Sequence, residues 1–451
     1  MPMTLEDGTD VLVSVLTRHG SRTSEDVRDV TAGLIRDGRL AVGTRLPTIR
    51  ELTQQSGVST RAIVSAWGSL RREGLIETNR RGGTVVVNSA TAGPAWSDRD
   101  LLSGSPDHRL QPDLTDALIA GLRSSQLNHP GREYITDRLR DAVLADWPFD
   151  AASFVAAGGG SEGLLLAVEA AAPAGSLVAV EEPVIPGFLD TLTEVGYEVI
   201  GIASDDEGAR PESLADALTR RPVAVVLQPE GAYSAFGALS ASRVAELVEV
   251  FQAADHLPWI VEDDAVGPLA QWQAPSVGET FGDRTVRVRS YCKAYGLDIK
   301  TCVIGGSTEL IDRVIRLRVH GIATNSRILQ DALAHLVVDA DTADGIAVAR
   351  SRYQQRRDGL VTELVARGAS ARAGRNSLVV WLDVRDETGA LIELARRGIH
   401  VGAGARSFVT PRSGGLLRIA VPQLPDDQAA LAELAEAAVE AAGSVHREFL
   451  G

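Results

Sequence analysis

The chain has 451 residues, of which 44% are hydrophobic and 23% are charged, and only two of them are cysteines. This length predicts two or three domains. The sequence shows neither an apolar run of membrane-spanning length nor a signal peptide, so we expect a cytoplasmic protein with no membrane partner. The two cysteines, Cys292 and Cys302, lie outside any CxxC spacing, and the sequence therefore predicts neither a disulfide framework nor a zinc site.

The net charge of −15 disfavours non-specific nucleic-acid binding by the chain as a whole. Residues 43–87 are an exception, because they contain seven arginines and three glutamates, a local charge of +4. A surplus of this kind suits contacts to DNA phosphates. The basic region is therefore the first candidate for a nucleic-acid partner.

Helical patterns lead into the basic region. Apolar residues at helical spacing predict a helix over residues 24–36. Thr48 and Glu51 have the spacing of a capping box and predict that a second helix begins there, while Ser59 can cap a third. The third helix has one apolar face, made by Ile63, Ala66, Trp67 and Leu70. Two β-rich runs, 75–78 and 84–87, then flank a basic glycine-containing tip and predict a hairpin.

This order of elements is that of a winged helix-turn-helix, whose third helix presents its first turn to the major groove. The run from Arg45 to Val87 closely resembles the GntR family of DNA-binding domains. The resemblance implies phosphate or base contacts by Arg45, Thr48, Arg50, Ser59, Thr60, Arg61, Arg80 and Gly83. A small helical domain with a solvated arginine-rich face is the alternative, which the ordered motif disfavours. We assign residues 1–88 to this domain.

Residues 89–112 are rich in Ala, Gly, Ser, Pro and Asp and show no sustained periodicity. We interpret them as a linker that settles onto the following domain. Its length would let the DNA-binding domain lie far from its own body or over that of a partner, and the sequence does not choose between these arrangements.

Residues 113–451 alternate apolar β-runs with helical patterns, which predicts an α/β domain with a mainly parallel sheet covered by helices. A smaller α+β portion is expected at the C-terminal end. The candidate strands of the domain are 177–180, 199–202, 223–227, 259–261 and 302–304, with 377–382 and 417–421 in the α+β portion.

Four signals in this domain indicate a ligand site. A glycine-rich turn ending in Gly160 and Ser161 opens a helix and offers N–H groups to a phosphate, although ordinary tight turns also use glycine. Asp263 follows a buried strand, where α/β proteins bind ligands; capping the next helix is its alternative role. Lys293 lies between two strands, and an unpaired lysine there would be costly to bury. Arg418 on a late strand would hold a carboxylate.

In order and spacing these signals resemble the fold-type I aminotransferases, which use pyridoxal 5'-phosphate (PLP). Joined to a GntR-like domain, this fold resembles the MocR subfamily of bacterial regulators, which are typically homodimers that sense PLP or a PLP–amino acid adduct. The resemblance implies a Schiff base on Lys293, a pyridine-nitrogen contact from Asp263 and a ligand carboxylate on Arg418. It also implies phosphate contacts from Gly160, Ser161, Ser290 and Lys300.

Several positions depart from the family pattern. Ile185 stands where a ring-stacking aromatic residue is common, and Ser234, next to Tyr233, replaces an asparagine that bonds the phenolic oxygen of the cofactor. Ala265 and Val266 stand where a tyrosine is expected. Lys300 replaces an arginine and loses its bidentate geometry. Because transamination requires proton transfer in defined geometry, we expect weak or absent turnover.

Three hypotheses follow. The first is a transcriptional regulator that binds an operator and senses PLP or an amino-acid-like effector. The second is an aminotransferase with a vestigial DNA-binding domain. In the third, the body of a regulator has lost PLP and binds another ligand or serves only for dimerisation.

Overall fold

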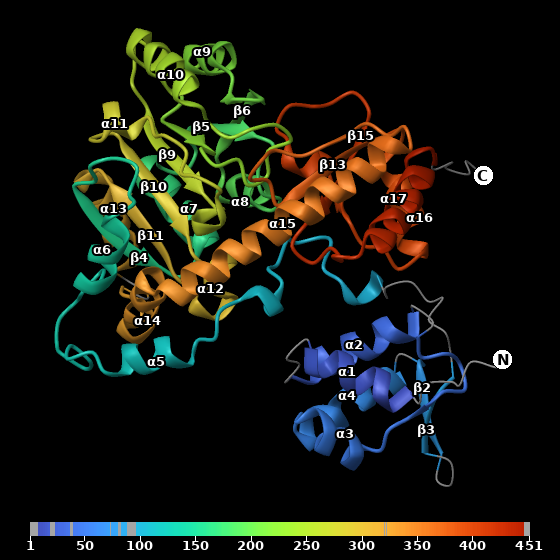
Figure 1. The fold of residues 1–451 in the computed structure, drawn as a ribbon. Coiled ribbons are helices and arrows are strands. Elements are labelled where there is room, and N and C mark those ends of the chain that lie inside the picture. The colour runs from blue at the N-terminus through green and yellow to red at the C-terminus, as the bar shows by residue number, and fades with distance from the viewer. Residues whose placement is uncertain are drawn as a thin grey trace. The chain divides into compact units, whose positions relative to one another are not determined.

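The computed structural model describes residues 8–18, 23–36, 39–72, 74–79, 83–87, 96–319, 321 and 323–445. Two compact units divide the chain between Ala95 and Trp96 (Figure 1). We call Met1–Ala95 the head and Trp96–Gly451 the body. Residues 96–112, which the sequence places in a linker, are part of the body.

The head contains four described helices and a small antiparallel sheet of order β1-β3-β2. Its elements are α1 (Gly8–Arg18), α2 (Ser24–Arg36), β1 (Arg45–Leu46), α3 (Ile49–Ser56), α4 (Thr60–Arg72), β2 (Ile76–Asn79) and β3 (Gly83–Val86). The predicted apolar face of α4 is buried in the core of the head, which also takes in residues of α1, α2 and α3. The sequence predicted α2, α3, α4 and the hairpin; α1 and β1 are additions.

The capping box predicted at Thr48 is confirmed. The Thr48 Oγ1 accepts a hydrogen bond from Glu51 N at 3.2 Å, and the Glu51 carboxylate accepts one from Thr48 N at 2.8 Å. Gly57 ends α3 with a left-handed φ of 72°, a conformation that favours glycine. Ser59 Oγ then accepts from Ala62 N at 3.2 Å and caps α4. These local contacts fix the turn between the two helices.

The body is built on an eight-stranded sheet of order β4-β11-β10-β9-β8-β5-β6-β7. Strands β10, β9, β8, β5 and β6 pair in parallel, whereas β11 and β7 pair antiparallel to their neighbours. The strands are β4 (Ser153–Ala157), β5 (Leu177–Glu182), β6 (Glu198–Asp205), β7 (Gly208–Ala209), β8 (Ala224–Leu227), β9 (Trp259–Asp264), β10 (Thr285–Ser290) and β11 (Cys302–Gly306).

Both faces of this sheet are buried. Val178 and Val180 of β5 belong to one apolar cluster, and Ala179 between them belongs to another. This alternation is expected for a parallel sheet covered on both faces. Its helices are α5 (Thr115–Leu122), α6 (Asp137–Leu144), α7 (Gly160–Ala171), α8 (Phe188–Val195), α9 (Pro211–Thr219), α10 (Ala241–Ala253), α11 (Gly278–Phe281), α12 (Cys292–Tyr295), α13 (Thr308–Arg318) and α14 (Arg327–Val338).

The 27-residue helix α15 (Ala340–Ala366) runs from the large sheet to the C-terminal portion (Figure 1). That portion contains an antiparallel sheet of order β12-β13-β15-β14 and two further helices. Its elements are β12 (Ala371–Arg372), β13 (Val379–Val384), α16 (Glu387–Arg396), β14 (Gly402–Ala403), β15 (Gly415–Ala420) and α17 (Gln428–Ala442). Short 3₁₀ helices complete the body: η1 (Trp96–Asp98), η2 (His108–Leu110), η3 (Gly267–Leu269), η4 (Leu297–Ile299) and η5 (Ala405–Ser407).

The first residues of the body pack against its C-terminal portion. Leu101 is fully buried, forms an isolated parallel bridge with Val401, and its carbonyl accepts a hydrogen bond from Ala420 N at 2.9 Å. Asp107 forms a buried ion pair with Arg356 of α15 at 2.9 Å. Segment 96–112 is thus held by residues far away in the sequence.

None of the helices in the described ranges has both the length and the apolar character needed to cross a bilayer.

Candidate functional site

Asp263 and Lys293 lie near each other where β9 and β10 end. Asp263 is the penultimate residue of β9, and Lys293 lies in α12, three residues after the last residue of β10. Burial raises the pKa of the Asp263 carboxyl to about 7, and the positive charge of Lys293 acts against that rise. No described residue donates a hydrogen bond to Asp263. The carboxyl is therefore available to a ligand that carries a proton.

Tyr233 brings a third side chain to Lys293. The Lys293 Nζ lies 5.9 Å from the centroid of the Tyr233 ring, which is almost fully buried. Ser234 follows it, but the Ser234 Oγ already accepts a hydrogen bond from Phe236 N at 3.0 Å. The serine hydroxyl therefore stabilises its own turn.

The glycine-rich turn packs directly against Ser290. A Cβ added to Gly160, the first residue of α7, would lie 2.9 Å from the Ser290 Cβ, so no side chain fits there. Ser161 follows on the exposed side. The Glu162 carboxylate folds back on this turn and accepts a hydrogen bond from Gly158 N at 2.7 Å. An acidic side chain of the protein thus uses one of the N–H groups at the predicted phosphate site.

The positions of Lys300 and Ile185 give less support to a role in the site. Lys300 is exposed, adopts a left-handed conformation with φ of 39°, and makes no polar contact with a described residue. Ile185 is half-buried and packs against two apolar clusters of the body. Neither residue is joined to Lys293 by a hydrogen bond or an ion pair within the described chain.

Arg418 lies on β15, opposite Trp381 of β13 and Gly402 of β14. A Cβ at Gly402 would be 2.5 Å from an Arg418 Nη atom, so this glycine makes room for the guanidinium. The buried Arg418 Nε has no hydrogen-bond partner among the described residues. Burial lowers the pKa of Arg418, and the nearby Tyr233 and Asp100 act in the opposite direction. Tyr233 is therefore near both Lys293 and Arg418.

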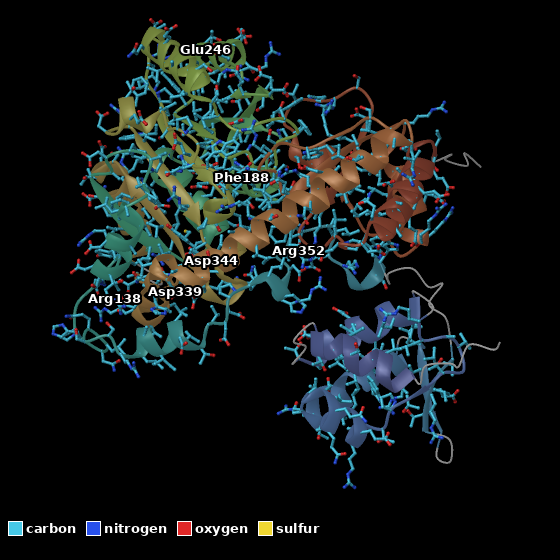
Figure 2. The ribbon with its side chains drawn as sticks, viewed as in Figure 1. Arg138, Phe188, Glu246, Asp339, Asp344 and Arg352 are labelled. Atoms are coloured by element: carbon cyan, nitrogen blue, oxygen red, sulfur yellow. The ribbon has the colours of Figure 1, made fainter. Side chains whose placement is uncertain are left out.

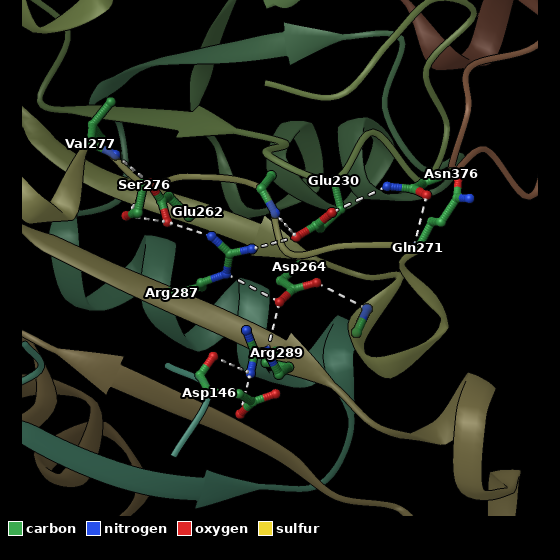
Figure 3. Close-up of polar contacts among 12 residues, drawn as sticks. Asp146, Glu230, Glu262, Asp264, Gln271, Ser276, Val277, Arg287, Arg289 and Asn376 are labelled. Carbon is green, nitrogen blue, oxygen red and sulfur yellow. Dashed lines mark hydrogen bonds and ion pairs between the residues drawn. The ribbon is translucent and has the colours of Figure 1, made fainter. Parts of the chain in front are cut away.

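A buried ionic cluster that was not predicted from the sequence lies beneath this edge (Figure 3). The Arg287 guanidinium is fully buried and donates to three carboxylates, while Arg289 donates to one of these carboxylates and to an exposed one. The contacts are Arg287–Glu230 at 3.0 Å, Arg287–Glu262 and Arg287–Asp264 at 3.1 Å, Arg289–Asp264 at 2.8 Å and Arg289–Asp146 at 3.1 Å.

The cluster orients Asp263. Side chains alternate along a strand, so Glu262 and Asp264 point to the arginines and Asp263 points to the opposite face. In the parallel register Arg287 pairs with Glu262 and Arg289 with Asp264. The sequence signal was the matching spacing of two acidic and two basic residues in neighbouring β-runs.

Segment 96–112 also reaches the site. The Gln111 Nε2 donates a hydrogen bond to the carbonyl oxygen of Lys293 at 3.1 Å. The Asp100 carboxylate acts electrostatically on Arg418. Composition alone gave no sign of these contacts, because both residues lie in an aperiodic stretch.

In the head, five of the predicted DNA contacts are exposed at the starts of two neighbouring helices. Thr48 and Arg50 are exposed at the start of α3, and Ser59, Thr60 and Arg61 are exposed at the start of α4. The two groups are tied by a 3.4 Å contact between the hydroxyls of Thr53 and Thr60.

Arg45 lies on β1, next to strand β3 of the hairpin. A Cβ added to Gly83 would come within 2.9 Å of the Arg45 Nε, so the absence of a side chain at Gly83 admits the guanidinium. No described carboxylate forms an ion pair with Arg45, Arg50 or Arg61. Arg80 lies outside the described residues.

Comparison with protein families assigns both units. Residues 101–437 match the family described as aminotransferase class I and II. The chain belongs to this family. Residues 23–86 match the bacterial regulatory proteins of the gntR family, so the head is a GntR helix-turn-helix unit.

Curated relatives share this composite architecture. The vitamin B6 salvage pathway transcriptional repressor PtsJ of Salmonella typhimurium is 27% identical over 420 residues, which covers 90% of this chain and 96% of the relative. The pyridoxine biosynthesis transcriptional regulator PdxR of Corynebacterium glutamicum is 28% identical over 57% of this chain and 60% of its own length. The relatives of the whole chain are thus named as regulators of transcription.

Solved structures show the fold of the body. An aspartate aminotransferase from Thermus thermophilus with maleate superposes with a TM-score of 0.64 at 18% identity, covering 84% of this chain and 96% of the enzyme. The kynurenine aminotransferase of Pyrococcus horikoshii in complex with PMP gives a TM-score of 0.66 at 17% identity, covering 75% and 90%. The predicted fold-type I aminotransferase-like body is confirmed.

Proposed function

We propose that this protein is a DNA-binding transcriptional regulator whose body senses PLP or an amino-acid-like effector. The observation that carries the proposal is the joining of a GntR head with exposed arginines to an aminotransferase-family body that keeps Lys293 beside Asp263. The naming of PtsJ and PdxR for the vitamin B6 salvage and pyridoxine biosynthesis pathways supports PLP as the effector chemistry.

The head would bind the operator through Arg45, Thr48, Arg50, Ser59, Thr60, Arg61, Arg80 and Gly83. The first turn of α4 would enter the major groove, since its Ser59, Thr60 and Arg61 are exposed. An arginine in this position reads a guanine with two hydrogen bonds. We infer a homodimer in the cytoplasm, with the two heads on the two halves of an operator.

The residues at the strand edge fit PLP. Lys293 would attach its aldehyde, the unbonded Asp263 carboxyl would face its ring nitrogen, and Gly160, Ser161, Ser290 and Lys300 would contact its phosphate. When bound, PLP supplies an aldehyde that condenses with amines and a ring that withdraws electrons. Asp263 would hold a proton on the ring nitrogen, and the buried Arg287 cluster keeps that carboxyl oriented.

Arg418 would select the effector. Its buried Nε, near Tyr233, has no hydrogen-bond partner among the described residues, so a carboxylate reaching this position would satisfy an open donor. A charged hydrogen bond of this kind contributes about 1.5–3 kcal/mol. An effector with both an amine and a carboxylate would therefore contact Lys293 and Arg418 together.

The site is poorly equipped for turnover. Ser234 uses its hydroxyl within its own turn, while Ile185 and Val266 supply no ring hydroxyl or aromatic face near the ligand. Without these groups the ring and its protons lack the positioning that transamination requires. A regulator needs only a difference in affinity between two states, and the remaining residues suffice for that.

A second candidate function is regulation by a ligand other than PLP. The observation in its favour is Glu162, whose carboxylate accepts the Gly158 N–H at the turn expected to bind phosphate. A phosphate would have to displace this carboxylate. Because the Glu162 side chain is about half exposed, at 48%, this movement meets little packing resistance.

An absorbance titration separates the candidates. Purified protein is mixed with PLP and the spectrum is compared with that of Lys293→Ala and of Lys300→Ala. The proposal expects a new absorption band in the wild type that is absent from Lys293→Ala and requires higher PLP concentrations in Lys300→Ala. A wild-type spectrum equal to that of free PLP would contradict PLP sensing and favour the second candidate.

The operator is identified by recovering genomic DNA fragments bound by the full chain. Fluorescence anisotropy on an enriched fragment, with and without PLP, then measures the coupling between body and head. Equal DNA affinity with and without PLP would contradict regulation by PLP. Repeated turnover of an amino acid to its keto acid by the PLP-loaded protein would indicate an aminotransferase instead.

A further inference from the structure

A cavity of about 320 Å³ lies between the first half of α15 and the η3 turn that follows β9. Its walls include Glu230, Pro268, Trp272, Tyr295, Ile346 and Arg350. None of the residues assigned to PLP or to the effector carboxylate lines it. Since liquid water occupies about 30 Å³ per molecule, the cavity has room for roughly ten groups of that size.

Three of the charged groups on its walls are already paired. Arg289 donates to Asp264 and Asp146, and Asp146 is in turn neutralised by Arg289 (Figure 3). Glu230 accepts hydrogen bonds from Ala274 N at 2.6 Å and from Arg287 at 3.0 Å. These groups leave no unmatched acidic charge that would draw a cation into the cavity.

Arg350 is the exception. It forms no ion pair with a described residue, and its Nε is buried without a hydrogen-bond partner. One Nη donates to the carbonyl oxygen of Pro268 at 2.8 Å, which fixes the guanidinium against the cavity wall. Burial lowers the pKa of Arg350, as expected for a cation without an opposing carboxylate.

Tyr295 adds a second open donor. It lines the cavity together with Arg350, and no described residue shares a hydrogen bond with its hydroxyl. Tyr295 stacks on Tyr291 with ring centroids 6.1 Å apart, so its ring is held in place. An incoming anion would meet a guanidinium and a phenol that are both preorganised.

The remaining walls combine the amide side chains of Gln271 and Gln273 with apolar groups. Ala343, Ile346 and Arg350 lie at i, i+3 and i+7 of α15 and so share one face of the helix. Pro268 and the half-exposed Trp272 stand across from them. The cavity thus has an anion-binding end and, beside it, space for a flat or aliphatic group.

We propose that this cavity binds a small organic anion, with its carboxylate or phosphate on Arg350 and Tyr295 and its apolar part between α15 and η3. The site is separate from the one formed by Lys293 and Arg418. It is therefore tested without reference to PLP.

The test is calorimetric titration of the full chain with benzoate, phenyl phosphate and the neutral benzamide. At least one anion is expected to bind and benzamide is not, and the preferred anion tells carboxylate from phosphate. Arg350→Gln should weaken that binding at least tenfold and Tyr295→Phe severalfold. Arg352→Gln, on the same helix but outside the cavity walls and paired with Asp426, should leave it unchanged (Figure 2).

The Lys293→Ala variant shows whether the anion binds in the cavity or in the PLP site. Retention of the preferred anion in this variant, together with its loss in Arg350→Gln, supports the proposal. Loss in Lys293→Ala with retention in Arg350→Gln would place the anion in the PLP site and overturn it. Binding of benzamide as tight as that of benzoate, or no binding of either anion, would overturn it as well.

Discussion

At the scale of single residues, the contrast between Asp263 and Asp264 explains how the site is prepared. Both carboxyls are buried on β9, but Asp264 faces two arginines and Asp263 faces a lysine 30 positions away. Arginine contacts lower the pKa of Asp264, while burial raises that of Asp263. Strand alternation thus gives neighbouring residues of the same type opposite roles.

Replacing Asp263 should change how stability depends on pH. Burial raises its folded pKa to about 7 from an ordinary value of 3.8, so the folded state holds the extra proton between these values. The free energy of unfolding therefore falls as pH rises through this window, by up to about 1.4 kcal/mol per pH unit for one proton. Asp263→Asn should flatten that fall in PLP-free protein, measured by urea unfolding from pH 5 to pH 7.

Asp255→Asn, which alters an exposed carboxylate, is the matched control and should follow the wild type. A residual slope is expected in Asp263→Asn, since burial also raises the pKa of Glu181 to about 7. An Asp263→Asn profile parallel to that of the wild type would contradict the buried carboxyl.

At the scale of elements, β9 and β10 are joined by ion pairs as well as by the sheet. Arg287→Met should destabilise the body by about 3–5 kcal/mol, because it leaves buried carboxylates without their cation. Arg284→Met is the control, since Arg284 lies over the Trp259 ring at 4.5 Å and its loss should cost about 0.5–1 kcal/mol. Urea-unfolding midpoints measure both stability losses. Equal losses would show that the buried ion pairs of Arg287 contribute no more to stability than the contact of Arg284 with Trp259.

Helix α4, the proposed recognition helix, carries a second element-scale prediction. Arg61→Ala should weaken operator binding by about 1–3 kcal/mol, as expected for loss of a base contact. Arg71→Ala, at the other end of α4 where the side chain donates to the Trp67 carbonyl, should have a smaller effect. Anisotropy titrations on the recovered operator compare the two variants. An unchanged operator affinity of Arg61→Ala would exclude Arg61 of α4 as a base contact.

Local signals explain which elements were predictable. Thr48 and Glu51 satisfy each other within one turn, so their sequence spacing predicted the start of α3. The apolar runs of β5, β8 and β9 likewise predicted the buried sheet. Arg287 and Arg289 were not recognised as buried, because alternating arginines on a strand resemble a solvated face until the acidic partners on the next strand are known.

At the scale of the whole molecule, the proposed function requires that an effector bound to the body change the affinity of the head for DNA. Arg418→Ala should reduce the change in operator affinity caused by amino acids added to PLP-loaded protein, while the PLP titration stays unchanged. The loss expected for one charged hydrogen bond, about 1.5–3 kcal/mol, corresponds to a tenfold or greater shift of the dose response. Arg406→Ala, an exposed neighbour paired with Asp190, is the control. An unmoved dose response in Arg418→Ala would remove this residue from effector binding.

The two-part architecture was predictable, but the path of the chain between its parts was not. Residues 96–112 lack periodicity, and their order comes from partners such as Arg356, Ala420 and Lys293, all more than 180 positions away. Sequence windows of helix or strand length cannot detect contacts of that range. The same limitation hid the approach of Asp100 to Arg418.

Segment 96–112 contacts two residues of the proposed effector site. Asp100 lies near Arg418, and Gln111 is hydrogen-bonded to the carbonyl oxygen of Lys293. A ligand bound at either residue would therefore also act on the segment by which the chain enters the body.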